Sequence, residues 1–326
     1  MRELKYSEEY PFKPFVFIGE RLKQNYDPSR TFLKNYNLKF ADQEQIKAIK
    51  LIAKTDELIG LKTKYGAINM YENDLVITST PGSRSVIPTP LNPENFKYWI
   101  IEFPEYLFDN NILPSISLMS NNLTVIAQIG KIGAYNFDHL KAAVYYSDND
   151  ILFKEPVVIN EEDIIELEFI YESLNNFKAT SFFTSSIGKT LNDFISTSRI
   201  EYDSPFKVIA LFSVIETLLT TTSKNSDQSI NRQLQKKIKL LNNQFEKKLD
   251  FTKYFKGPDT LTEELIIEKL YTYRSKIAHG DYYDFNKELQ VLGDHKTIFE
   301  FLNLLTKRLI LFSINNCQFM LDLKEC

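Results

Sequence analysis

The sequence predicts an α+β N-terminal domain followed by an all-α C-terminal domain. Ten of the twelve prolines lie before residue 160, where short β-like runs alternate with turn residues. From residue 161 onward the chain reads as a succession of helical patterns separated by short polar connections. A length of 326 residues is sufficient for two cores. We therefore expect domains at residues 1–156 and 157–326.

The N-terminal half is expected to hold one amphipathic helix among short strands. The helix covers residues 42–54, because Asp42 is a suitable N-cap and apolar residues follow at helical spacing. Pro88, Pro90 and Pro93 predict a loop that no regular element crosses. Apolar runs between turn residues predict strands at residues 65–70, 75–80, 98–103, 123–129 and 142–146.

The C-terminal half is expected to be helical throughout. Pro205 suits the first turn of a helix, and Gly280 suits the position just after a helix end. The predicted helices cover residues 161–175, 185–198, 205–221, 230–242, 262–279 and 296–323.

Composition excludes several classes of protein. No run of about 18 apolar residues could span a bilayer, and the first residues lack the apolar core of a secretory signal, so we expect a cytoplasmic protein without membrane contact. Two cysteines, Cys317 and Cys326, are too few for a disulfide framework. Three scattered histidines, His139, His279 and His295, form no ligand cluster, so we expect neither a metal nor another cofactor.

Charge is distributed unevenly along the chain. The net charge of −4 argues against a protein that binds nucleic acid over its whole surface. Residues 232–256, however, hold eight basic residues against two acidic ones. Such a run is either a solvated face or a set of phosphate contacts. The candidates for RNA contact are Arg232, Lys236, Lys237 and Lys239.

The segment YTYRSKIAHG carries the sharpest chemical signal. Four residues separate Arg274 from His279, and Gly280 follows at once. Histidine can accept or donate a proton near neutral pH, and arginine offers a planar fork of donors to phosphate oxygens. Five residues rotate an ideal helix by about 140° net, so the two side chains do not share a face. A symmetric pair of helices could bring arginine and histidine to one phosphate, which predicts a dimer.

Structural interpretations compete with this chemistry. His279 could serve only to bond the last carbonyl groups of its helix. Arg274 could belong to an ordinary ion pair, with Glu263, Glu264 or Asp281 as its partner. His139 and His295 have no partner at useful spacing and are expected to be incidental.

Three helical segments together resemble a known family. They are FKVIALFSVIETLLT, SINRQLQKKIKLL and LYTYRSKIAHG, and their order and spacing are similar to the HEPN superfamily, most closely its Apea-like branch. The resemblance covers about residues 160–326 and implies an all-α HEPN-like helical bundle there. Residues 1–155 resemble no family comparably.

The resemblance implies a metal-independent endoribonuclease of a toxin or antiviral defence system. It implies RNA, with tRNA among the candidates, as the partner, and a homodimer formed through the C-terminal helices. Arg274 and His279 correspond to the catalytic pair. Glu216, Tyr273, Ser275 and Lys276 are the supporting residues. We interpret Glu216 first as a structural partner for a core donor such as Arg274, because a buried carboxylate needs pairing.

Three functions follow as competing hypotheses. The first is an endoribonuclease whose N-terminal half senses, restrains or positions a target. The second is a HEPN-like module that binds RNA or nucleotide, or only dimerises, without cutting. The third is a structural adaptor in a defence assembly.

Overall fold

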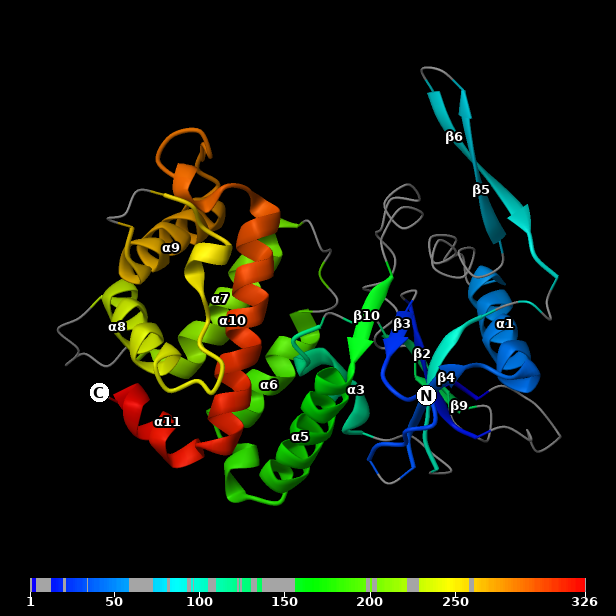
Figure 1. The fold of residues 1–326 in the computed structure, drawn as a ribbon. Helices are drawn as coiled ribbons and strands as arrows, with labels where there is room; N and C mark the ends of the chain where they lie inside the picture. Colours follow the sequence, from blue (N-terminus) through cyan, green and yellow to red (C-terminus); the bar gives the residue numbers. More distant parts are fainter. Residues whose placement is uncertain are drawn as a thin grey trace. The chain divides into compact units, whose positions relative to one another are not determined.

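The chain forms two compact units, Met1–Tyr171 and Glu172–Cys326, hereafter unit 1 and unit 2 (Figure 1). The computed structural model describes residues 2–3, 13–19, 22–33, 35–58, 73–80, 83–92, 95, 97–104, 110–121, 123, 125–129, 134–136, 156–197, 200, 204–221, 229–257 and 261–325.

Unit 1 combines strands with a few helices. The helices in its described part are α1 (Gln43–Leu58), α3 (Ile112–Leu118) and the first part of α5 (Glu161–Lys178). Its strands are β1 (Arg2–Glu3), β2 (Phe15–Ile18), β3 (Leu22–Asn25), β4 (Asn37–Phe40), β5 (Asn73–Thr80), β6 (Ser83–Pro90), β7 (Trp99–Glu102), β8 (Val125–Ile129), β9 (Ala134–Asn136) and β10 (Val157–Asn160).

A six-stranded sheet in the order β1-β9-β8-β2-β7-β4 forms the centre of unit 1, and its paired strands are antiparallel. All four residues of β2 are buried, as are all four of β7, so both faces of these strands are covered. Two smaller sheets pair β10 with β3 and β5 with β6. Strands β5, β7 and β8 confirm three expected strands. The expected strands at 65–70 and 142–146 lie outside the described residues.

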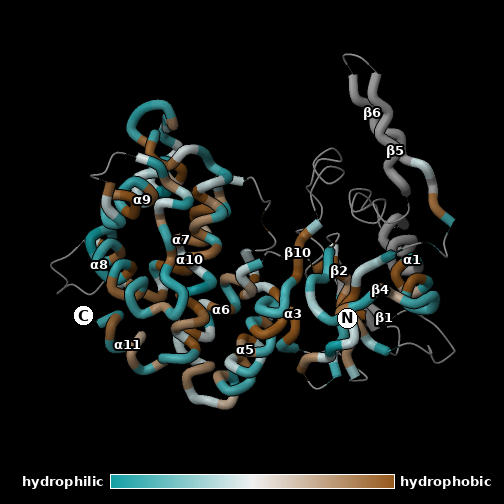
Figure 2. Tube along the Cα trace, viewed as in Figure 1, coloured by the Kyte–Doolittle hydropathy of each residue, from teal (hydrophilic) through white to brown (hydrophobic). Residues whose placement is uncertain are grey.

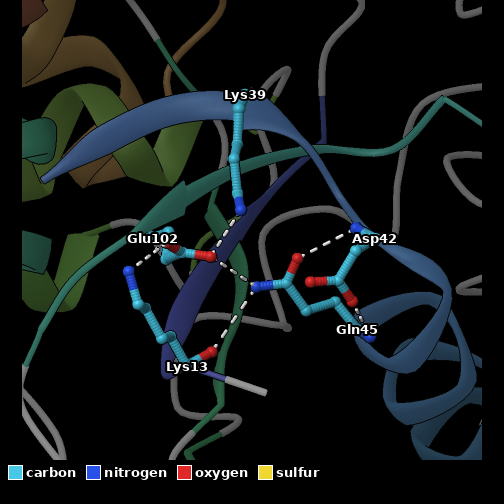
Figure 3. A network of polar contacts seen from close by, with 5 residues as sticks. All are labelled: Lys13, Lys39, Asp42, Gln45 and Glu102. Atoms are coloured by element: carbon cyan, nitrogen blue, oxygen red, sulfur yellow. Dashed lines mark hydrogen bonds and ion pairs between the residues drawn. The ribbon is translucent and has the colours of Figure 1, made fainter. Parts of the chain in front are cut away.

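A polar network around the buried side chains of Gln45 and Glu102 fixes the start of α1 (Figure 3). The Asp42 carboxylate accepts a hydrogen bond from the Gln45 backbone N–H at 2.9 Å, which confirms Asp42 as the N-cap. The Gln45 amide in turn donates to Glu102 at 3.1 Å. Burial raises the pKa of Glu102, but Lys39 at 2.6 Å, Lys13 at 3.2 Å and the Gln45 amide together outweigh it and hold that pKa below its ordinary value. The network therefore links the predicted helix to the sheet.

The expectation that prolines exclude regular structure at residues 88–93 is wrong for Pro88 and Pro90. Both lie in β6, which pairs antiparallel with β5 and with no other strand of the described chain. Every second residue of such an edge strand turns its nitrogen away from the partner, where proline loses no hydrogen bond. Pro88 and Pro90 are two residues apart, so both can lie at these positions. Pro93 lies outside the described residues.

The boundary between the units falls inside α5. The structure divides the chain between Tyr171 and Glu172, whereas the sequence predicted a division between residues 156 and 157. The first half of α5 belongs to unit 1, where Arg30 forms ion pairs with Glu161 and, at 3.1 Å, with Glu168. Ion pairs between residues so far apart in the sequence cannot be predicted from local sequence patterns.

Unit 2 is helical in its described part. After the end of α5 come α6 (Ser186–Thr197), α7 (Pro205–Leu219), α8 (Ile230–Asn242), α9 (Glu263–His279), α10 (His295–Asn315) and α11 (Cys317–Glu325). Short 3-10 helices cover Ser181–Thr184, Phe251–Lys253 and Gln290–Leu292. The order of a sheet-containing unit followed by a helical one is therefore confirmed, and helical structure is present in each predicted range.

One predicted helix is divided in two. Residues 296–323 were expected to form a single helix, but α10 ends at Asn315 and α11 begins at Cys317. At the break, the side-chain amides of Asn315 and Asn316 donate to the carbonyl groups of Leu311 and Phe312 at 2.9 and 3.0 Å. Asparagine competes in this way with the helical backbone, which explains the break.

The central helix of unit 2 is α7, which packs against α6, α8, α9, α10 and α11. Its residues Val208, Leu211, Ile215 and Leu219 are fully buried or nearly so. Figure 2 shows hydrophobic stretches along α7 and α10 and a hydrophilic loop after α9. None of the helices in the described ranges is long and apolar enough to cross a membrane.

Candidate functional site around Arg274 and His279

Helices α7 and α9 hold the candidate site. Pro205 occupies the first turn of α7, as predicted. The Thr262 hydroxyl caps α9 by accepting a hydrogen bond from the Leu265 backbone N–H at 3.3 Å. The apolar residues Ile266 and Leu270 then pack α9 into the core of unit 2. Local signals therefore set the residue at which each helix begins, and apolar packing holds α9 in the core of unit 2.

Arg274 of α9 pairs with Glu216 of α7. The Arg274 Nη2 atom donates to Glu216 Oε2 at 3.3 Å and lies 3.3 Å from Oε1. The Arg274 guanidinium also lies over the ring of Tyr271, 5.7 Å from its centre. Glu216 is therefore the partner of Arg274, as interpreted from the sequence, while Glu264, another predicted partner, pairs with Lys239.

The pair is only partly satisfied. The side chains of Arg274 and Glu216 are 23% and 17% exposed. Both contacts use Nη2, and the buried atoms Arg274 Nε and Glu216 Oε1 have no hydrogen-bond partner within the described chain. Burial raises the pKa of Glu216, and the positive charge of Arg274 lowers it without cancelling the rise. The pair therefore leaves one donor of Arg274 and one acceptor of Glu216 without a hydrogen-bond partner in the described chain.

His279 is the last residue of α9 and is exposed. Gly280 follows with φ 72° and ψ 20°, the left-handed conformation that glycine adopts readily. The Gly280 and Asp281 backbone N–H groups donate to Ile277 and Lys276 carbonyls at 3.2 and 2.8 Å, which confirms the predicted helix end. The backbone thus caps the helix, and no hydrogen bond or ion pair joins the His279 ring to any described residue.

Tyr273 has a structural position. It is fully buried, and its hydroxyl shares a hydrogen bond with His295 Nδ1 at 2.9 Å. Its ring meets those of Tyr283 and Phe285 at 4.9 and 5.3 Å. Burial raises the pKa of the Tyr273 hydroxyl, with a smaller contribution from Tyr283. Tyr273 therefore fixes α9 against the start of α10, and the expectation that His295 is incidental is wrong.

Lys276 and Ser275 complete the predicted supporting residues. The Lys276 ammonium donates to the Tyr282 carbonyl at 3.0 Å and to Glu288 at 2.7 Å. Lys276 therefore fastens the loop after α9. Ser275 is half-buried and makes no side-chain hydrogen bond to the described residues.

The four predicted RNA contacts of α8 lie in different environments. Arg232 and Lys236 are exposed. Lys237 is only 7% exposed and donates to the Lys324 carbonyl at 3.1 Å, near the C-terminal end of α11, where a cation is favourable. Lys239 is exposed but pairs with Glu264. In this structure Lys237 is therefore not available to phosphate, because its ammonium lies inside unit 2.

His295 is the residue of this region that sequence reasoning missed. Asp294 caps α10 by accepting a hydrogen bond from the Thr297 backbone N–H at 2.7 Å, so His295 stands in the first helical turn. That cap was readable from the sequence, but the approach of Tyr273 depends on tertiary packing. His139 lies outside the described residues.

Comparison of the chain with family models, curated proteins and solved structures gives no match. Within the described ranges, no three histidine, cysteine or carboxylate side chains lie together as a metal site. A functional assignment therefore rests on the residues of α7, α8 and α9 and on the loop that follows them.

Proposed function

We propose that this protein is a metal-independent endoribonuclease that acts as a homodimer. The observation that carries the proposal is that one helix carries both an arginine positioned by its neighbours and an exposed histidine that makes no hydrogen bond or ion pair with the described residues. Arg274 is positioned by Glu216 and Tyr271 with donors left unused. His279 stands exposed five residues later, at the helix end. The HEPN-like sequence pattern gives the same two residues.

The chemistry assigns a role to each side chain. A histidine takes the proton of a ribose 2′-hydroxyl, whose oxygen then attacks the adjacent phosphorus. The bond from phosphorus to the 5′-oxygen breaks, and a second histidine supplies the proton that this oxygen needs. The products are a 2′,3′-cyclic phosphate and a free 5′-hydroxyl. Arg274 stabilises the negative charge that builds on the non-bridging oxygens.

A dimer supplies the second histidine. The side of α7 that carries Glu216 also carries Phe206, Ile209, Ala210 and Ser213, which recur at helical spacing. None of these side chains is buried, and Phe206 is 67% exposed. A largely apolar stripe beside the candidate pair is suited to a second copy of the same helix, which would bring two Arg274–His279 pairs together. Light scattering at micromolar concentration tests this step.

The deciding experiment is RNA cleavage in the presence of a chelator. We expect His279→Ala to reduce the rate by roughly 10²–10⁴-fold while RNA affinity is nearly unchanged. Arg274→Ala should cost on the order of 10²–10³-fold, with little rescue by Arg274→Lys, because lysine lacks the planar fork. Lys269→Gln is the matched control, since it removes a cation from the same helix five residues before Arg274.

Two results would reject the proposal. Cleavage at the parental rate by folded Arg274→Ala and His279→Ala proteins would show that these residues are not the site. Binding of RNA by the parent protein without any cleavage, across total RNA and tRNA, would favour the non-catalytic binding module instead. Every variant must be folded at the assay temperature, which its melting temperature shows. For Arg274→Ala a lower melting temperature than that of the parent is expected.

A further inference from the structure

The loop after α9 presents one aromatic ring to solvent. Tyr282 is 81% exposed and stands three residues after His279. The next residue, Tyr283, turns the other way, because its ring packs edge-on against the buried Tyr273 at 4.9 Å. Phe285 joins the same cluster, 5.7 Å from Tyr283. The chain therefore packs the half-buried rings of Tyr283 and Phe285 against Tyr273 and leaves Tyr282 exposed.

The backbone beneath this ring is held on both sides. The Asp281 N–H donates to the Lys276 carbonyl at 2.8 Å, and the Tyr282 carbonyl accepts from the Lys276 ammonium at 3.0 Å. The same ammonium pairs with Glu288 at 2.7 Å, which closes the loop. A tyrosine side chain has only two rotatable bonds to order. Stacking of a ligand on Tyr282 would therefore cost the protein little side-chain conformational entropy.

Charge alone does not attract a polynucleotide to this place. From residue 274 to residue 288 the chain has three cations, Arg274, Lys276 and Lys287, and three anions, Asp281, Asp284 and Glu288. The basic run of residues 232–256 has eight basic residues against two acidic ones. The loop itself therefore adds no net phosphate attraction, and it needs another kind of contact to hold an RNA strand at His279. An exposed aromatic face provides such a contact for any base.

We infer that Tyr282 stacks on an unpaired base beside the phosphate that His279 cleaves. This inference rests on the proposed function and adds the class of substrate, which is single-stranded RNA or an unpaired loop. Three residues of extended chain span at most about 11 Å, so the ring lies within reach of a nucleotide at His279. Bases in an A-form duplex are stacked on one another and cannot reach the ring without being pulled out. Tyr282 therefore selects against duplex RNA.

Binding measurements test the inference separately from cleavage. In the non-cleaving His279→Ala background of the full chain, we would measure the affinity for a 12-nucleotide RNA and for the duplex of the same sequence. Tyr282→Ala should weaken the single strand by roughly 5- to 20-fold, the lower part of the range for one base stacked on an aromatic ring. Tyr282→Phe should bind like the parent, because the ring remains. Phe319→Ala, which removes a 45% exposed aromatic ring from α11, is the control and should bind like the parent.

A spectroscopic signal gives a second measure. Tyr282→Trp in the same background should show fluorescence quenching with the single strand and none with the duplex, after subtraction of the signal of Trp99. Unchanged affinity in Tyr282→Ala, an equal loss for duplex and single strand, or an absence of quenching would overturn the inference. Cleavage by the parent protein in chelator that depends on Arg274 and His279 but not on Tyr282 would leave the proposed function standing alone. Quenching without cleavage would leave the stacking site standing without the nuclease.

Discussion

Removal of Arg274 tests whether the Glu216 pair is understood. At 3.3 Å and an effective dielectric constant of about 20, two unit charges attract each other by about 5 kcal/mol. Desolvation opposes this gain, and the raised pKa of Glu216 indicates that burial outweighs the pairing for the carboxylate. A fully buried pair costs about 3–5 kcal/mol when one partner is removed. Because both side chains are partly exposed, we expect Arg274→Ala to lower the free energy of unfolding by about 2–3 kcal/mol at pH 7.5.

The double variant separates pairing from packing. Arg274→Ala with Glu216→Gln removes both charges and should recover part of the loss, which gives a coupling energy of about 1–3 kcal/mol. Urea unfolding followed by the helical circular dichroism signal measures all four proteins. Additive single effects, within about 0.5 kcal/mol, would refute the claim that the two charges interact.

The pH dependence of Arg274→Ala has a definite sign. Without Arg274, the folded pKa of Glu216 rises further above its ordinary value of 4.5. Between these two values the folded state binds more protons than the unfolded state, so stability falls as pH rises. The loss caused by Arg274→Ala should therefore be smaller at pH 5 than at pH 7.5. The double variant, which has no carboxyl group at residue 216, should show no such difference.

Three further predictions concern α7, α8 and the end of α9. Burial lowers the pKa of Lys207 from 10.5 to about 8, so the parent should gain up to roughly 3 kcal/mol of stability between pH 8 and pH 10.5 relative to Lys207→Met in urea unfolding. Gly280→Ala should lower stability by about 1 kcal/mol from backbone strain alone, because an added Cβ meets no atom within 4 Å, and Gly280→Asn should cost less. Lys236→Gln should flatten the salt dependence of single-strand RNA binding by about 0.7, and Lys239→Gln by less, because Lys239 already pairs with Glu264.

Each of these has a result that would contradict it. Parallel pH profiles of the parent and Lys207→Met would mean that the ammonium stays charged, held by the Ile200 carbonyl at 3.2 Å and the Phe299 ring at 4.9 Å. An unchanged melting temperature in Gly280→Ala would remove the strain argument. An unchanged salt slope in Lys236→Gln would make this residue part of a solvated face.

Helices were predictable because their signals are local. Caps such as Asp42 and Thr262, the first-turn Pro205 and the terminal Gly280 all act within one turn of the backbone that they satisfy. Strands β2, β3 and β4 were not predicted. Each has four residues, and β2 is buried along its whole length, so it shows no alternation of apolar and polar residues. Their pairing joins segments far apart in the chain, which no local pattern specifies.

The candidate site was predictable in part for the same reason. The partnership of Glu216 with Arg274 followed from the cost of burying an isolated carboxylate, a rule that needs no structure. The burial of Lys237 did not follow, because it depends on where α11 ends and on the free carbonyl of Lys324 there. His295 was missed likewise, since its partner Tyr273 is on another helix.

In unit 2, the cations that would attract RNA and the histidine that would cleave it lie on different helices. Helices α8 and α9 pack side by side, so the exposed Arg232 and Lys236 stand on the neighbour of the helix that carries His279. Two contacts would hold an RNA strand at His279. The cations of α8 attract its phosphates, which depends strongly on salt, and Tyr282 stacks on a base, which depends on salt much less. Raising salt should therefore increase the KM of the proposed cleavage much more than it lowers kcat. Equal losses in KM and kcat would place the cations of α8 at the reacting phosphate itself.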